Sequence, residues 1–195
     1  MTLVDYYAPS RTHSVGRWLY SIIAIAFGNA LIALSAQISI MLPFSPVPIT
    51  GQTFGVLLVA AALGRVRGTI AVASYLLEGA SGLPVFASGA AGAMYLFGPT
   101  GGYLFAFIPA AWLTGYLAER GWTMRWLSTA LTMLLGSAVI LTIGTLVLSL
   151  FVGNSQAMMM GFVPFIVGDV VKIAAATLVL PSAHKLLQRG NQSDR

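Results

Sequence analysis

Charge is scarce in this chain of 195 residues: only 8% are Asp, Glu, Lys or Arg, against about 25% in an ordinary soluble domain. Because 57% of the residues are hydrophobic, a water-soluble fold could not cover its surface with polar side chains, which excludes a soluble enzyme. The same apolar content excludes a disordered chain. Cysteine is absent, so there are no disulfides, thiolate metal sites or cysteine nucleophiles. The composition predicts an integral membrane protein with a single domain, residues 1–195.

The few charged residues leave three long intervals free of charge. No Asp, Glu, Lys or Arg occurs within residues 18–64, 79–118 or 126–168. A membrane-spanning helix needs about 20 predominantly apolar residues, so each interval has room for two passes, or for one pass and a buried loop. The intervals therefore predict an all-α protein that crosses the membrane several times.

Six helices are predicted from the apolar runs and the residues that interrupt them. The first run stops where Pro43, Pro46 and Pro48 remove backbone donors and restrict the residues before them. The segment 79–98 contains five glycines and one proline and is predicted to be a structured loop. The predicted helices are residues 18–42, 51–64, 68–78, 99–117, 124–151 and 164–187, with a polar segment at 1–16 and a polar tail at 189–195.

The distribution of basic residues tests this number of spans independently. If the N-terminus is cytoplasmic, the inner segments 1–17, 65–67, 119–125 and 185–195 hold nine of the ten basic residues, and the outer segments hold none. Cytoplasmic loops of membrane proteins are enriched in Lys and Arg. The pattern predicts six transmembrane helices with N- and C-termini cytoplasmic, and it explains the net charge of +5 without a nucleic-acid partner. A cleaved signal peptide is the competing interpretation of the first apolar run, but that run is longer than the usual ~7–15 residues.

The tenth basic residue lies inside the last predicted helix. Lys172 follows Asp169 by three positions, which places both side chains on one helical face, close enough to pair. An isolated charge at membrane depth costs several kcal/mol, and ionisable residues there usually mark a functional cavity. The pair therefore predicts a site for a polar ligand arriving from outside. The alternative is an ion pair that only fixes helix packing.

The other polar features give weaker indications. Glu78 lies at the outer end of the third helix, where it either lines the same cavity or reaches the interface. His13 and His184 belong to no metal-binding or triad spacing, so no metal site is predicted. The Gly-rich segments 79–89 and 98–102 lack the Gly-Lys-Ser/Thr ending of a phosphate-binding loop. The chain is expected to have no cofactor and no ATP site, and its glycines to fold irregular backbone over a buried ligand.

Five sequence blocks follow one another in an order typical of a known family. They are AQISI at 36–40, PVPITGQTF at 46–54, YLLEGASGLPVF at 75–86, GPTGGY at 98–103, and Pro164-Phe165 followed by Gly168-Asp169 and Lys172. Together they resemble the BioY family, the biotin-binding S components of energy-coupling factor (ECF) transporters. The blocks extend over residues 36–172, most of the chain.

The resemblance implies a high-affinity biotin-binding subunit of a vitamin importer. Such a subunit captures biotin at the extracytoplasmic side and delivers it with a transmembrane T component and ABC-type ATPases, in a bacterial or archaeal cell (inner) membrane. Transport with and without those partners is compatible with the sequence. Three alternatives stay open: an S component for another vitamin, a small intramembrane enzyme, and a secondary transporter. The enzyme would need a nucleophile with a base, or a metal cluster, and the secondary transporter would need two related halves.

The resemblance also implies roles for individual residues. Asp169 and Lys172 are expected to contact biotin, one as an acceptor and one as a donor, beneath a lid formed by residues 43–52. Related sequences can carry an asparagine in the Gly-rich loop, and the loop of this chain has none. A contact from this loop to the ureido group would therefore come from Ser88 or from the backbone. The full expected set of substrate-binding residues is Asp169, Lys172, Tyr95, Gln52, Ser88 and Glu78.

Two small residues on the first helix are expected to dock the partner proteins. Ala26 and Ala30 are four positions apart, and small residues at this spacing let two membrane helices approach closely. By resemblance, alanines of this kind form the docking surface of ECF S components. The alternative is that they pack inside the helix bundle.

Overall fold

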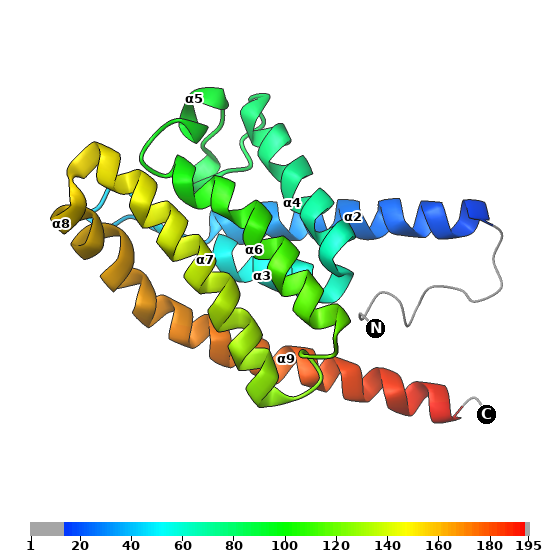
Figure 1. Cartoon of the computed structure of the whole chain (residues 1–195). Helices are drawn as coiled ribbons and strands as arrows, with labels where there is room; N and C mark the ends of the chain where they lie inside the picture. The colour runs from blue at the N-terminus through cyan, green and yellow to red at the C-terminus, as the bar shows by residue number, and fades with distance from the viewer. Residues whose placement is uncertain (1–13, 194–195) are drawn as a thin grey trace.

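A computed structural model describes the backbone of residues 14–193 and the side chains of residues 16–183. Most of the predicted N-terminal segment 1–16 and the end of the tail 189–195 lie outside this description. The elements are α2 (Ser14–Gln37), β1 (Ser39–Ile40), β2 (Ile49–Thr50), α3 (Gln52–Leu63), α4 (Arg65–Ala80), the 3-10 turn η1 (Ala87–Gly89), α5 (Ala93–Leu96), α6 (Gly101–Glu119), α7 (Trp126–Val152), α8 (Asn154–Ala157), the π-turn η2 (Met158–Phe162) and α9 (Val163–Ser193) (Figure 1).

The mostly helical fold is confirmed. Each of the six predicted ranges overlaps a helix, and the described chain has two further helices of four residues, α5 and α8, that were not predicted. Four helical stretches are long and apolar enough to cross a membrane: Gly16–Gln37, Gly101–Glu119, Trp126–Val152 and Asn154–Ala183. Helices α3 and α4 have 12 and 16 residues, which is short of the about 20 that a perpendicular span requires. Most side chains of α3 are nevertheless buried among the other helices.

Helix α6 lies at the centre of the bundle and packs against α7, α3 and α4. Helix α9 packs against α7 and α3, and α2 covers α3 and α4 (Figure 1). Close approach of α6 and α7 depends on Gly144, because a Cβ atom there would collide with the ring of Tyr103. The smallest of the cavities described below lies between α3, α7 and α9, and the next one lies beside α3 and α6.

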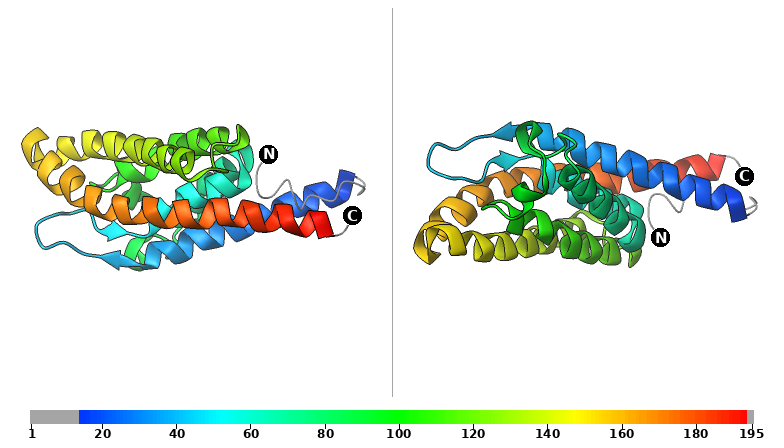
Figure 2. Two further views of the ribbon diagram at one scale, coloured as in Figure 1. Left: turned by 90° about the horizontal axis from the view of Figure 1, so that it is seen from below. Right: turned by 90° about the horizontal axis from the view of Figure 1, so that it is seen from above.

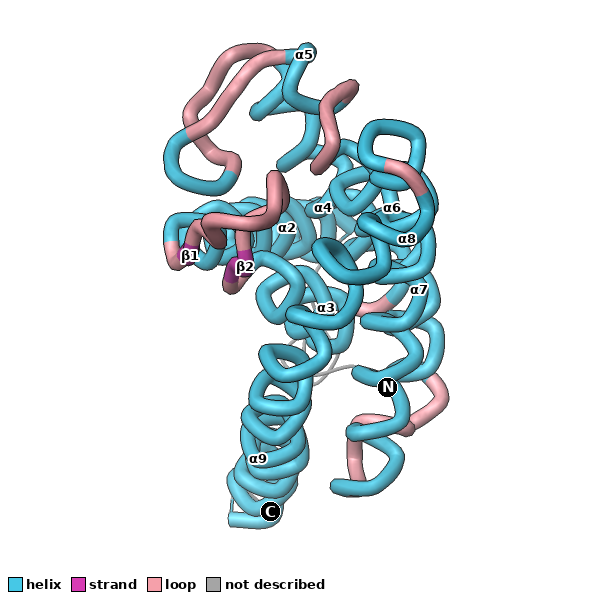
Figure 3. Tube along the Cα trace, turned by 90° about the vertical axis from the view of Figure 1, so that its left-hand side faces the viewer, coloured by secondary structure: helices cyan, strands magenta, loops and turns pink. Residues whose placement is uncertain are grey.

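The first helix ends earlier than its hydropathy predicts. Helix α2 stops at Gln37 instead of residue 42, and the chain continues into β1, which pairs antiparallel with β2 (Figure 3). Ser39 is opposite Thr50 and Ile40 is opposite Ile49. The strands satisfy backbone groups that a longer helix would otherwise have satisfied, and they hold residues 41–48 as a hairpin loop.

The Gly-rich segment forms the predicted structured loop. The Phe86 ring is fully buried and packs against α4 at Gly79, where any Cβ atom would occupy the place of the ring. The Gln37 side-chain amide at the end of α2 donates to the carbonyls of Val85 and Phe86, at 3.4 and 3.3 Å. The loop is therefore attached to both α2 and α4.

The two described ends of the chain lie at the same end of the bundle. The start of α2 and the end of α9 are together there with the α3–α4 and α6–α7 turns, and the β1–β2 hairpin and α8 lie at the opposite end (Figure 2). Arg17, Arg65, Arg120 and Arg125 thus belong to one end of the molecule.

Candidate functional site

The predicted pairing of Asp169 and Lys172 is confirmed. Both residues lie in the first third of α9, and the Lys172 Nζ atom is 3.5 Å from Asp169 Oδ1. Asp169 is buried and Lys172 is half-buried. Since charges at this depth need compensating partners, the pair is the principal polar feature of the bundle interior.

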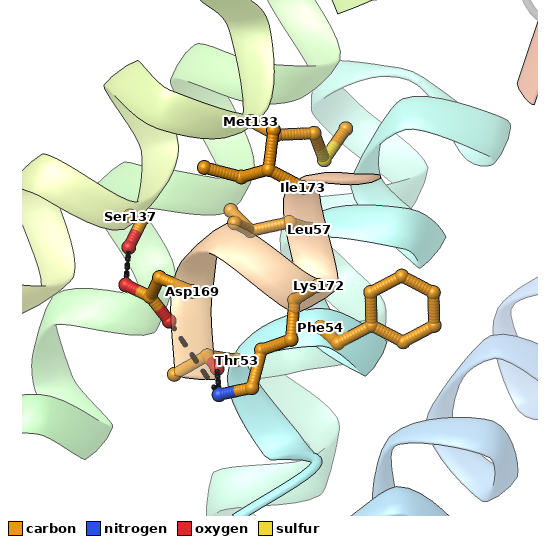
Figure 4. Close-up of a pocket in the computed structure, with 8 residues that line it drawn as sticks. All are labelled: Thr53, Phe54, Leu57, Met133, Ser137, Asp169, Lys172 and Ile173. Carbon is orange, nitrogen blue, oxygen red and sulfur yellow. Dashed lines mark hydrogen bonds and ion pairs between the residues drawn. The ribbon is translucent and has the colours of Figure 1, made fainter. Parts of the chain in front are cut away.

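Two hydroxyl groups from other helices complete the contacts of the pair. Lys172 Nζ donates to the Oγ1 atom of Thr53 on α3 at 2.6 Å, and Ser137 on α7 donates to Asp169 Oδ2 (Figure 4). Sequence analysis did not identify Thr53 or Ser137. Thr53 lies in the PVPITGQTF block, which was a usable signal, whereas Ser137 is one of many hydroxyl residues in an apolar helix.

The space beside the pair is small. A void of about 10 Å³ is lined by the four polar residues just described together with Phe54, Leu57, Met133 and Ile173 (Figure 4). The aliphatic and aromatic side chains make the surroundings of the pair largely apolar, and polar contacts are stronger in such surroundings than in water.

A much larger hollow lies between the hairpin loop and the Gly-rich loop. It has a volume of about 380 Å³ and includes Met41, Pro46, Ser88, Met94 and Tyr95 in its wall. This is the size of a small-molecule site, for which about 300–1,000 Å³ is typical.

A narrow cavity of about 30 Å³ lies between the large hollow and the ion pair. It shares Tyr95 and Pro48 with the hollow, and it shares Thr53 with the void beside Asp169 and Lys172. The three spaces form a series from the hairpin end of the bundle to the pair on α9.

Gln52 and Tyr95 belong to the wall of this series. Gln52 is buried, accepts from Thr50 at 3.2 Å and donates to the hydroxyl of Tyr75, which in turn donates to the Val85 carbonyl at 3.1 Å. The Tyr95 ring stacks on Phe86 with centroids 5.3 Å apart. Tyr95 is therefore positioned by Phe86 within the Gly-rich loop, and Gln52 is linked to that loop through Tyr75.

Ser88 lies on the wall of the large hollow, away from the ion pair. Its hydroxyl is 2.7 Å from that of Ser39 on β1, and its φ of 56° falls in the left-handed region. Non-glycine residues adopt this region uncommonly, so the position of the Ser88 side chain depends on the surrounding loop.

Glu78 is not brought together with the other predicted site residues. Its Oε1 atom accepts from the amide of Asn29 on α2 at 2.8 Å, and Glu78 is not among the residues that line the three cavities described above. The contact joins α4 to α2. A packing role between these helices accounts for Glu78 better than contact with a ligand.

Ala26 and Ala30 are exposed on α2, whereas Gly28 between them is buried. A Cβ atom at Gly28 would lie 2.8 Å from Val59 Cγ1 and 2.9 Å from Leu63 Cδ1. Gly28 therefore supports packing inside the bundle, and the two alanines are on the outer surface of α2.

No metal site is evident within the part of the chain that the structure describes, where no three His, Asp or Glu side chains gather as ligands would. The polar groups beside the ion pair are the Asp169 carboxylate, the Lys172 ammonium and the hydroxyls of Thr53 and Ser137, and the Gln52 side chain lines the neighbouring narrow cavity.

Comparisons with known proteins identify close relatives. Residues 9–189 match the profile described as "BioY family". "Biotin transporter BioY" of Thermotoga maritima is 45% identical over 160 residues, covering 81% of this chain and 92% of that protein. "Probable biotin transporter BioY" of Pyrococcus horikoshii is 41% identical over 155 residues, covering 80% and 90%. A crystal structure of the S component for biotin from an ECF-type ABC transporter superposes with a TM-score of 0.81 and 27% identity, covering 89% of this chain and 95% of that one.

Proposed function

Because the chain belongs to the BioY family, we propose that it is the biotin-binding subunit of a vitamin importer. The observation that carries the proposal is the buried Asp169–Lys172 pair at the inner end of a series of cavities. A transporter subunit needs a ligand-binding site of this kind but no catalytic group. This agrees with the BioY family, whose members are transporters and not enzymes.

The site chemistry suits biotin, a bicyclic urea with an acyl tail. The Asp169 carboxylate can accept from a ureido N–H, and the Lys172 ammonium can donate to a carbonyl or pair with a carboxylate. Tyr95 and the apolar side chains near the pair provide walls for the ring system. We propose Gln52 as a further polar contact, and Ser88 as a contact at the outer hollow.

The large hollow is proposed to receive biotin first. It lies between the hairpin loop and the Gly-rich loop, so residues 43–52 are placed to act as a lid over the ligand. Thr53 marks where the narrow cavity reaches the ion pair, and biotin would advance toward that point.

Ligand identity is the most direct test. Mass spectrometry of the denatured, freshly purified protein should detect biotin. Free biotin at about 100 times its Kd should add about 2.7 kcal/mol to the free energy of unfolding, because it binds the folded state alone. The measurement is the melting temperature in detergent with biotin, thiamine or riboflavin. A rise with thiamine or riboflavin and none with biotin would assign the chain to another vitamin.

We further propose six membrane passes with both termini in the cytoplasm of a bacterial or archaeal cell, in the inner membrane where the cell has two. The support is that the start of α2 and the α3–α4 and α6–α7 turns, which carry Arg17, Arg65, Arg120 and Arg125, lie at one end of the bundle, and cytoplasmic loops are enriched in basic residues. Helices α3 and α4 would then each complete a pass with the help of buried polar neighbours.

This topology can be tested with single cysteines, since the chain contains none. An impermeant thiol reagent applied to intact cells should label Gln156→Cys in the exposed α8 turn. Ser193→Cys near the end of α9 should be labelled only after the membrane is permeabilised. The reverse pattern would place the termini outside and overturn the proposed orientation.

The proposed partners are a transmembrane T component and ABC-type ATPases, which bind and hydrolyse ATP in place of this chain. The resemblance assigns docking to Ala26 and Ala30, and their exposure on α2 agrees with an external role. No cofactor of its own is proposed for the chain.

A further inference from the structure

Two hydroxyl groups hold the charged pair from opposite sides. We propose that Thr53 and Ser137 are positioning residues for ligand binding: Thr53 fixes the Lys172 ammonium, and Ser137 occupies one oxygen of Asp169. The pair then presents one acceptor and one donor, side by side, to the ligand. This inference rests on the proposed function, because the ligand used to test it is biotin.

The contacts of Asp169 define what the carboxylate can still accept. Ser137 donates to Oδ2, and Lys172 lies 3.5 Å from Oδ1. Ser137 and Asp169 are both buried, so water has little access to the contact between them. With one contact on each oxygen, the carboxylate plane is fixed and each oxygen keeps acceptor capacity for a ligand, that of Oδ1 lying next to the ammonium.

Thr53 determines where the ammonium lies. A lysine has a flexible stem of four carbons, so its head needs fixed acceptors to stay in one place. Thr53 Oγ1 is 2.6 Å from Nζ and is the shorter of the two contacts of the head, the other being Asp169. An ammonium has three N–H donors, so one donor stays available after these two contacts.

The position of Thr53 links this geometry to ligand access. Thr53 lines both the narrow cavity and the void beside the pair, and it is buried near the N-terminus of α3. The Thr53 hydroxyl therefore holds the Lys172 ammonium where the narrow cavity meets the void beside the pair. A ligand that comes from the outer hollow would reach the ammonium at this point. Ser137 approaches from α7 on the other side, so helices α3 and α7 together orient a pair carried by α9 (Figure 4).

A double-mutant cycle with the full-length chain tests the proposal. Thr53→Val removes the hydroxyl with little change of shape and should weaken biotin binding by roughly fivefold to tenfold, the scale of one ordinary hydrogen bond. Thr53→Ser keeps the hydroxyl and should bind like wild type. In a Lys172→Met background, Thr53→Val should cause no further loss, because its effect passes through Lys172.

Ser137 is tested in parallel. Ser137→Ala should weaken binding by roughly fivefold to tenfold in the wild type. It should have no effect when Asp169→Leu has removed the acceptor. The matched control is Thr114→Val, since Thr114 is a fully buried hydroxyl on α6 without a hydrogen-bond partner. This control should leave the Kd for biotin unchanged.

The outcomes separate the two proposals. If wild type fails to bind biotin, the proposed function is wrong, and this inference is wrong with it. If wild type binds and Thr53→Val and Ser137→Ala bind equally well, only the positioning roles are overturned. Equal losses in the wild-type and Lys172→Met backgrounds would also overturn the role of Thr53. The melting temperature of each variant without biotin separates a loss of binding from a loss of folding, and Thr53→Ala serves as a second variant if Thr53→Val does not fold.

Discussion

Asp169→Asn and Lys172→Met are each expected to weaken biotin binding by at least about tenfold, the largest binding effect of any single substitution in this chain. Each change removes a proposed ligand contact and leaves the other charge of the 3.5 Å pair buried without its partner. A hydrogen bond to a charged group contributes about 1.5–3 kcal/mol, and about 1.4 kcal/mol corresponds to a factor of ten. The measurement is the Kd for labelled biotin with purified protein.

The double variant Asp169→Asn with Lys172→Met distinguishes binding from stability. Removing both charges leaves no uncompensated ion, so its melting temperature should exceed that of either single variant. Its biotin binding should nevertheless stay weak, because both proposed contacts are gone. A matched control is Arg65→Met, which breaks the exposed pair with Glu119 at 3.4 Å and should leave binding unchanged. Wild-type affinity in both single variants would make the pair on α9 a purely structural one.

Ala26→Leu combined with Ala30→Leu is expected to abolish ATP-driven biotin uptake and leave biotin binding intact. Both alanines are exposed on α2, so larger side chains fit without disturbing the bundle. The same side chains would prevent another membrane helix from approaching closely. Uptake of labelled biotin is measured in vesicles that contain the T component and the ATPases, and the Kd is measured on the isolated chain.

The control for docking is Ala138→Leu, which enlarges an exposed alanine on α7 and should affect neither uptake nor binding. Gly28→Leu gives the contrasting case, because its side chain would collide with Val59 and Leu63 and should destabilise the fold. Normal uptake by the Ala26 and Ala30 double variant would move the docking surface elsewhere. Loss of biotin binding in that variant would place the alanines in the core of the bundle.

Much of the fold could be predicted because the bilayer restricts the solutions so strongly. Long intervals without charge leave helices as the main way to satisfy the backbone, and glycine and proline mark where they stop. The end of α2 was mispredicted for a physical reason. Residues 38–42 are apolar enough to extend a helix, but Ser39 and Ile40 pair with β2 instead. That pairing depends on Thr50, which is remote in sequence, and hydropathy contains no information about it.

Only the charged residues of the ion-pair site could be singled out from the sequence. Asp169 and Lys172 are conspicuous because charged residues are so rare in the membrane-spanning stretches. Thr53 and Ser137 are neutral, and serines and threonines are common in this chain. Their contacts join residues 119 and 32 positions apart, which only the packing of α3, α7 and α9 determines. Glu78 is the opposite case. Its charge made it a candidate site residue, but its side chain accepts a hydrogen bond from Asn29 and joins α4 to α2.

The confinement of both charges to one helix has a consequence for biogenesis. On insertion scales, a lone Asp or Lys at the centre of a helix costs about 2.5–3.5 kcal/mol. Because Asp169 and Lys172 are one turn apart, α9 can neutralise them within itself as it leaves the translocon, before any hydroxyl from another helix reaches it. Had the two charges been placed on separate helices, each would have entered lipid alone. The last segment can therefore partition into the bilayer as a neutral helix, and the polar contacts of the site form at the later step, when α9 packs against α3 and α7.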